Sequence, residues 1–279
     1  MANNNSDVLI RLEMKYANIL PSSICIFGVI AHVFLIVAFI KDPLKCFRNA
    51  GTYLVGHLAI SDLLFCLASL VERHILVTWH LILLFVKHVC VGVSILTIAA
   101  ISIDRFLLIV YPMKYRVFMK GKLIVVWSAC IWLILSGISS EVFIRNSLND
   151  LTVHIKHFSE ITAIIFSCVM YGLTYFKLKK QSRNLARESI SHRQEQTRVM
   201  KEKRFLRTIS FIACIQMVCI VPSIIFYNYQ QFHAPREDNP LHNIGLFYLN
   251  FAVNPMVYIL RLPNYQKTFC ILYCCKAGR

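Results

Sequence analysis

A few ionisable side chains interrupt long apolar runs in this sequence, and their types suggest charge pairing and ion binding. Asp104 and Arg105 are adjacent within "AAISIDRFLLIVYPMKY" (99–115), and Asp62 stands alone in another apolar run. A carboxylate beside a guanidinium can form an ion pair, whereas a lone buried carboxylate requires a cation, a proton or a strong hydrogen-bond donor. Because burying such groups is costly, each one is a candidate for function. The other ionisable side chains within long apolar runs are His32, His57, Glu72, Arg73, Lys87, His88 and Glu141.

The elements that must position these residues are long and apolar. Hydrophobic residues make up 57% of the chain and charged residues only 16%, with a mean hydropathy of +0.58, which is too apolar for a soluble domain of 279 residues. We predict an all-α membrane protein, a single seven-helix domain covering 1–279, with an N-terminal segment 1–16 and a C-terminal segment 261–279. The predicted membrane-spanning windows are 17–40, 50–71, 81–110, 123–144, 158–176, 205–227 and 240–260.

Basic residues are distributed unevenly between the loops. Of the 30 Lys and Arg residues, 22 lie in alternate loops and the tail, namely 41–49, 111–122, 177–207 and 261–279. Because basic loops stay cytoplasmic, we expect a plasma-membrane protein with its N-terminus outside and its C-terminus inside. The net charge of +16 then requires no nucleic acid, since a basic inner face can meet anionic membrane lipids and an acidic partner.

Both ends of the chain contain candidate modification sites. Asn4, followed by Asn5 and Ser6, fits a glycosylation acceptor on the predicted external side. Cys270, Cys274 and Cys275 cluster just past the last span, where either reversible palmitoylation or unmodified interfacial cysteines would fit.

Two polar segments extend the predicted helices on the cytoplasmic side. The stretch 177–207 contains no Gly or Pro, so we expect it to lengthen the fifth and sixth helices. In 261–276, Tyr265, Phe269, Leu272 and Tyr273 recur every three or four residues. That spacing predicts an amphipathic helix lying on the membrane surface.

Motifs in six of the predicted helices carry a resemblance to one family. The stretch "SIDRFLLIVYPMKY" (102–115) closely resembles the Asp-Arg-Tyr region of rhodopsin-like (class A) G-protein-coupled receptors. "LAISDLLF" (58–65) is similar to that family's second-helix Leu-Ala-x-x-Asp, and "NPMVY" (254–258) matches its seventh-helix Asn-Pro-x-x-Tyr. The resemblance implies a receptor rather than an enzyme. It extends to Trp132, Tyr171, Glu202 and the helix-kinking prolines Pro222 and Pro255.

The resemblance implies a latch at the inner end of the bundle. In inactive receptors of this family the arginine pairs with its neighbouring aspartate and with a sixth-helix glutamate, which here would be Arg105, Asp104 and Glu202. Outward movement of the sixth helix would break the contact with Glu202 and open a cavity for a heterotrimeric G protein. Tyr171 and Tyr258 would hold that open state through their hydroxyls.

A second set of residues maps onto the sodium pocket of the family. Asp62, Ser94, Asn250 and Asn254 all offer oxygen atoms, the ligand type that such an ion prefers. His32 stands where the first helix usually has an asparagine that bonds this aspartate, so we expect His32 and Asp62 to lie side by side. His32 could donate an ordinary hydrogen bond, displace the ion by carrying a charge itself, or act as a proton switch.

Several positions depart from the usual family pattern. Ile220 replaces the toggle tryptophan of the sixth helix, Gln216 replaces a phenylalanine, and Ala163 replaces the fifth-helix proline. His80 replaces the third-helix cysteine and 145–157 contains no cysteine, so no outer disulfide is expected. Melanocortin-like receptors share part of this pattern and have an acidic residue at the position of Glu72.

The predicted ligand pocket lies at the outer end. Lys87 stands where amine receptors place a carboxylate, so a simple amine ligand is not expected. Tyr248 stands in place of the Schiff-base lysine, so retinal is not expected either. The candidate residues of the ligand pocket are Glu72, Arg73, Lys87, His88 and Tyr248. Lys87 either receives an anionic group of the ligand or is neutralised by Glu72, and we favour the internal pair because buried charges are normally matched.

The sequence thus predicts a receptor that couples an unidentified extracellular ligand to G proteins by movement of the sixth helix. A constitutive or heteromer-dependent receptor is an alternative, given Ile220 and Gln216. A seven-helix transporter with Asp62, His32 and Lys87 as a relay is another, although it leaves the latch motifs unexplained.

Overall fold

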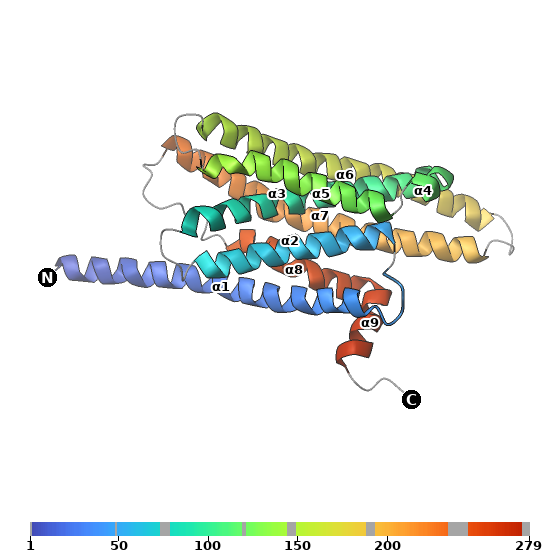
Figure 1. Ribbon diagram of the computed structural model, residues 1–279, viewed down its shortest axis with the longest axis horizontal. Helices are drawn as coiled ribbons and strands as arrows, with labels where there is room; N and C mark the ends of the chain where they lie inside the picture. The colour runs from blue at the N-terminus through green and yellow to red at the C-terminus, as the bar shows by residue number, and fades with distance from the viewer. Residues whose placement is uncertain are drawn as a thin grey trace.

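Helices account for nearly all of the residues that the computed structural model describes. The structure describes residues 2–47, 49–72, 79–118, 121–143, 149–187, 193–233 and 245–274, and within these ranges it contains helices and no strand. The long helices run side by side along the longest axis of the molecule, and two short helices lie toward one end (Figure 1). The long helices are α1 (Ala2–Lys41), α2 (Ala50–Glu72), α3 (His80–Val110), α5 (Gly121–Ser139), α6 (Asn149–Arg187), α7 (Arg193–His233) and α8 (Gly245–Arg261); the short ones are α4 (Pro112–Phe118) and α9 (Pro263–Tyr273).

The seven predicted helices are all present, with some bounds shifted. The first helix begins at Ala2, before the predicted span 17–40, since 2–20 contain no Gly or Pro to interrupt it. Its apolar stretch Ile19–Lys41 agrees closely with that span. The fourth ends at Ser139 and continues as a 3₁₀ turn, Ser140–Phe143. The fifth and sixth extend beyond the apolar windows, as expected. Among the described residues, five stretches are long and apolar enough to cross a bilayer, namely Ile19–Lys41, Ala50–Glu72, His80–Val110, His157–Asn184 and Val199–Ile225; Leu123–Ser139 is a shorter apolar helix.

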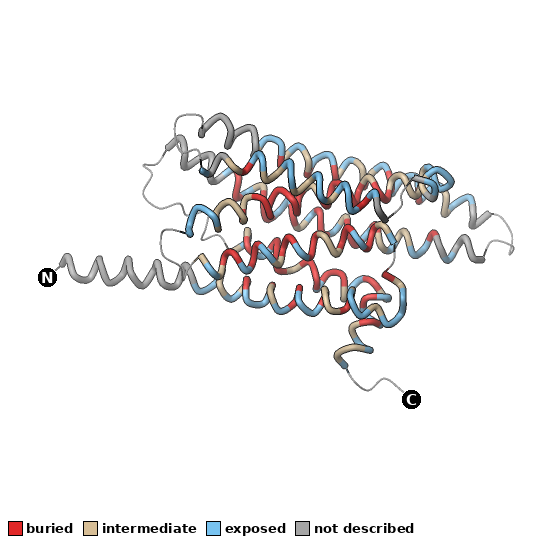
Figure 2. Tube along the Cα trace, in the orientation of Figure 1, coloured by how far each residue is buried: buried red, intermediate tan, exposed pale blue. Residues whose placement is uncertain are grey.

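The core lies along the faces that the helices turn toward one another, and α3 runs through its centre (Figure 2). One buried cluster lies around Leu58, Ile98 and Tyr258, toward the end of the bundle that carries α4 and α9 (the inner end), and another lies around Phe65 and Phe251, toward the opposite (outer) end (Figure 1). Large apolar side chains also cover the outer faces of the helices. Apolar exposure of this kind suits a bundle whose surroundings are lipid.

A chain of hydrogen bonds joins α5, α2 and α3. The indole Nε1 of Trp132 donates to His57 Nε2 at 2.7 Å, and His57 Nδ1 lies 3.0 Å from the Thr97 hydroxyl, which donates to the Val93 carbonyl at 2.6 Å. Because an indole N–H can only donate, His57 Nε2 must accept, and the ring proton is on Nδ1. His57 is therefore a neutral structural residue that links three helices.

Trp132→Phe should destabilise the protein by about 1–3 kcal/mol, because His57 Nε2 loses its donor in a partly buried site. Thermal unfolding of the purified protein in detergent measures the effect. Trp127→Phe is the matched control, because Trp127 is 49% exposed on the same helix. Equal unfolding temperatures for the two variants would contradict a structural role for this hydrogen bond.

Candidate functional site

Arg105 is buried at the inner end of α3, where it meets α7. Its Nη2 lies 2.7 Å from Asp104 Oδ2, and its Nη1 donates to Glu202 Oε2 at 2.9 Å. The guanidinium carbon also lies 4.3 Å from the centre of the Phe205 ring. The Arg105 side chain is 6% exposed, Asp104 0% and Glu202 23%. A desolvated cation is thus matched by one carboxylate on its own helix and by another on α7.

The short helix α4 supports this arrangement from the side. The Tyr115 hydroxyl donates to Asp104 Oδ1 at 2.6 Å. Burial, together with the charge of Asp104, raises the pKa of Tyr115, so the hydroxyl keeps its proton and remains a donor. Sequence reasoning missed both Tyr115 and Phe205, although each follows a recognised motif residue closely along the chain.

Tyr171 and Tyr258, the two tyrosines expected to act in the open state, are engaged elsewhere in this conformation. The Tyr171 hydroxyl donates to the Ile98 carbonyl at 3.1 Å. Tyr258 stacks on Tyr265 of α9, with ring centres 5.8 Å apart. Its hydroxyl has no hydrogen-bond partner in the part of the chain that the structure describes. In this conformation Arg105 is paired with carboxylates, and the described contacts of the two tyrosine hydroxyls do not include it.

Polar side chains also gather in the middle of the bundle. Asn254 Nδ2 donates to Asp62 Oδ2 at 2.6 Å, and Ser94 lies next to the same carboxylate. Asn250 is one turn before Asn254 on the same face of α8. Asp62 Oδ1, Ser94 Oγ and Asn254 Oδ1 are buried oxygens without a hydrogen-bond partner among the described residues. Three unsatisfied oxygens, one of them from a carboxyl group, form a ligand set that fits a small cation.

His32 does not form the expected pair with Asp62. Its Nε2 donates to the Phe251 carbonyl at 2.7 Å, and the ion pairs within the described ranges do not include it. The physical reason lies four residues further along α8, where Pro255 has no N–H to satisfy that carbonyl. Since a carbonyl only accepts, Nε2 carries the proton, and His32 is a hydrogen-bond donor to the kinked helix.

The outer site contains the internal ion pair that the sequence favoured. Lys87 Nζ lies 2.5 Å from Glu72 Oε2, and the two side chains are 7% and 12% exposed. His80 Nδ1 lies 3.4 Å from the other oxygen of Glu72, a contact that sequence reasoning missed. Tyr248 is buried nearby in the outer core cluster, and His88 is half-buried. Arg73 lies outside the described residues.

The helix α9 lies against the inner end of α1. The Tyr273 hydroxyl donates to the Phe34 carbonyl at 2.8 Å, and the two rings are 4.8 Å apart. Cys270 and Cys274 are exposed, as a lipid attachment site requires. Cys275 lies outside the described residues, as does the side chain of Asn4.

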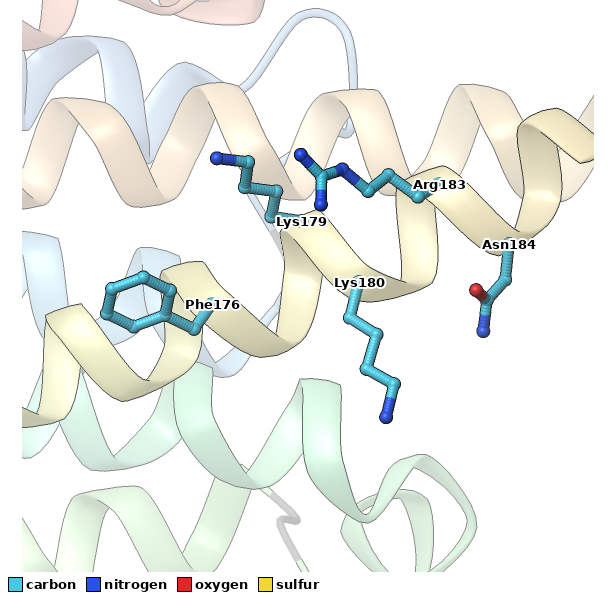
Figure 3. A pocket seen from close by; sticks show the side chains of 5 residues that line it. All are labelled: Phe176, Lys179, Lys180, Arg183 and Asn184. Carbon is cyan, nitrogen blue, oxygen red and sulfur yellow. The ribbon is translucent and has the colours of Figure 1, made fainter.

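A basic hollow of about 500 Å³ lies at the inner end of α6 (Figure 3). Phe176, Lys179, Lys180, Arg183 and Asn184 line it and are all exposed. Lys179 and Arg183 extend to one side of the helix, and Lys180 and Asn184 to the other (Figure 3). None of the ion pairs within the described ranges involves these three cations.

Replacing Glu72 by Gln should destabilise the protein by about 3 kcal/mol, because Lys87 would remain buried without its nearest carboxylate. Thermal unfolding of the purified protein measures the loss. The double variant Glu72→Gln/Lys87→Met removes both charges and should recover most of the stability. A double variant as unstable as Glu72→Gln alone would contradict the pairing.

Known receptors are similar to this chain over most of its length. It is 24% identical to the [Phe13]-bombesin receptor of Bombina orientalis, in a match that covers 97% of this chain and 78% of that receptor. It is 23% identical to melanocortin receptor 5 of Mus musculus, covering 90% and 82%. With bombesin receptor subtype-3 of Ovis aries the identity is 22%, covering 90% and 73%.

The family model described as "7 transmembrane receptor (rhodopsin family)" matches residues 32–258. This match includes Arg105, Glu202, Asp62 and Asn254, whose contacts are described above. The chain therefore belongs to the rhodopsin family of seven-transmembrane, G-protein-coupled receptors.

Proposed function

We propose that this receptor lies in the plasma membrane with its N-terminus outside and responds to an extracellular ligand by moving the inner part of α7 away from α3. The observation that carries the proposal is the ion pair between Arg105 on α3 and Glu202 on α7, at 2.9 Å. It ties together two helices that would have to separate. A G protein would enter at this inner end, where the basic segments lie.

The chain has a structural basis for such a movement. Pro222 lies inside α7 and cannot donate a backbone hydrogen bond to the carbonyl of Val218, so the helix is weakened there. The inner part, which contains Glu202 and Phe205, can then swing as a unit. Once Glu202 leaves, Arg105 has one carboxylate fewer and is free to bind an acceptor of the G protein.

A second candidate function, a receptor with high activity in the absence of ligand, is favoured by Gln216. This side chain is 1% exposed on α7, and its Nε2 has no hydrogen-bond partner among the described residues. A buried, unsatisfied amide weakens the packing of the inactive conformation. Ile220, where the family usually has tryptophan, is buried in the outer core cluster.

For the ligand we propose a peptide. The similar receptors are named for bombesin and for melanocortin, and this chain carries no carboxylate at the third-helix position where amine receptors have one. The charge of Lys87 is matched by Glu72, so an anionic ligand has less to gain there. A peptide that contacts the outer site through neutral groups fits these constraints.

We also propose that Asp62, Ser94 and Asn254 hold a sodium ion, which would supply the positive charge that the buried carboxylate lacks. Their unsatisfied oxygens support this assignment. His32 donates to α8 instead of pairing with Asp62, so it leaves the carboxylate available.

Glu202→Ala should raise ligand-independent nucleotide exchange on G proteins, because α7 loses its charge contact with α3. Arg105→Ala should weaken coupling. Exchange is measured per receptor at the cell surface, with the wild type as reference. Basal activity of Glu202→Ala equal to that of wild type would contradict the latch.

Sodium should stabilise the purified receptor by about 1 kcal/mol at several times its Kd, relative to potassium at the same ionic strength. Asp62→Asn should abolish that difference, whereas His32→Asn should retain it because His32 is not paired with Asp62. The readout is the thermal unfolding temperature. Equal unfolding temperatures in sodium and in potassium would contradict the proposed ion site.

The hollow on α6 fits the phosphate headgroup of an anionic lipid, since Phe176 lies one turn before Lys180 at the end of the apolar span. Lys180→Ala/Arg183→Ala should weaken binding of a phosphoinositide in nanodiscs by tenfold or more, as each basic residue contributes about 1 kcal/mol. Lys41→Ala/Lys267→Ala is the control with equal charge loss. Equal weakening in both variants would indicate nonspecific attraction only.

A further inference from the structure

Gly51 lies directly against the guanidinium of Arg105. It is buried in the first turn of α2, and a Cβ atom at this position would lie 1.7 Å from Arg105 Nη2, 2.7 Å from Cζ and 3.2 Å from Nε. The first two distances are too short for any real contact. Nη2 would have to move by more than about 1 Å, and Nη2 is the atom that lies 2.7 Å from Asp104.

The start of α2 cannot easily move away from Arg105 to make room for a side chain at position 51. Asn49 caps the helix, since its side-chain oxygen accepts hydrogen bonds from both the backbone N–H and the hydroxyl of Thr52 at 3.0 Å. Gly51 lies between these two residues. A side chain at position 51 would therefore displace the guanidinium before it displaced the helix.

The guanidinium is also enclosed on its other sides. Phe205 lies 4.3 Å from its carbon, and Asp104 and Glu202 pair with its two terminal nitrogens. Arg105 thus occupies a slot between α2 and α7, in which it reaches both carboxylates at once. The slot has its present width because residue 51 has no side chain.

We propose that Gly51 is a positioning residue of the latch, which allows Arg105 to pair simultaneously with Asp104 and Glu202. This inference rests on the proposed function of that ion pair. Asp104 belongs to the same helix as Arg105 and moves with it, whereas Glu202 is on α7. A displaced guanidinium therefore pairs less well with Glu202 on α7, and α7 moves away from α3 more readily.

The test compares Gly51→Ala with Gly56→Ala, which lies on the same helix and whose added Cβ would be 3.9 Å from Phe39, an ordinary contact. Basal nucleotide exchange per surface receptor should rise about five- to tenfold in Gly51→Ala, the factor expected when one charge-assisted hydrogen bond is weakened. Gly56→Ala should match the wild type. The double variant Gly51→Ala/Glu202→Ala should be no more active than Glu202→Ala alone.

Two outcomes separate this inference from the latch itself. If Glu202→Ala raises basal activity but Gly51→Ala behaves like Gly56→Ala, the role of Gly51 is overturned and the latch stands. If neither Glu202→Ala nor Gly51→Ala raises it, the latch fails. Additive effects in the double variant would also overturn the role of Gly51, since the two residues would then act separately.

Poor expression of Gly51→Ala is itself informative, because a clash with Arg105 is relieved when that side chain is shortened. Gly51→Ala/Arg105→Ala should reach the cell surface as well as Arg105→Ala. Continued failure of the double variant to reach the surface would show that Arg105 is not what the new side chain meets, and would overturn the proposal.

Discussion

The charge of Arg105 must be matched in every conformation that the bundle adopts. Its guanidinium is buried where α2, α3 and α7 meet, between a carboxylate of its own helix and one of α7. In the proposed mechanism Arg105 keeps Asp104 but loses Glu202 when α7 moves, so an acceptor that replaces Glu202 makes that movement more favourable. A G protein can supply that acceptor. Binding of the G protein and movement of α7 are then coupled, and each favours the other.

The other buried polar groups differ in how fully they are hydrogen-bonded. His57 and His32 each donate or accept within a defined arrangement, and they link helices without carrying charge. Ser94, Asn254 and Gln216, on α3, α8 and α7, keep polar atoms without partners in the described part of the chain, and so does Nδ1 of His32 on α1. Unsatisfied groups weaken packing locally.

Sequence patterns were enough to predict the positions of the helices and to identify the residues that lie in family motifs. Apolar windows located the seven spans, and family motifs located Arg105 and Glu202. The contact between His32 and the Phe251 carbonyl could be predicted from Pro255, which leaves that carbonyl without a helical donor, whereas the family pattern indicates Asp62 as the partner of His32. Gly51 could not be found this way, because its importance depends on how closely the start of α2 approaches α3.

The other contacts that the sequence did not predict are contacts between side chains of different helices. The link from Trp132 through His57 to Thr97 requires three helices to meet at one depth, and periodicity along a single helix contains no such information. The same holds for His80 beside Glu72. Helix ends also depend on local composition beyond the apolar window, as the early start of α1 shows.

The distance between the inner ends of α7 and α1 shows directly whether Glu202 holds α7 against Arg105. Spin labels at Met200→Cys and Lys41→Cys, both exposed positions, report it in a receptor whose other accessible cysteines are replaced by serine. With Glu202 present, we expect one main distance in the absence of ligand and G protein. Glu202→Ala should add a population at longer distance, because α7 is no longer tied to Arg105. Identical distance distributions in the two backgrounds would contradict the account.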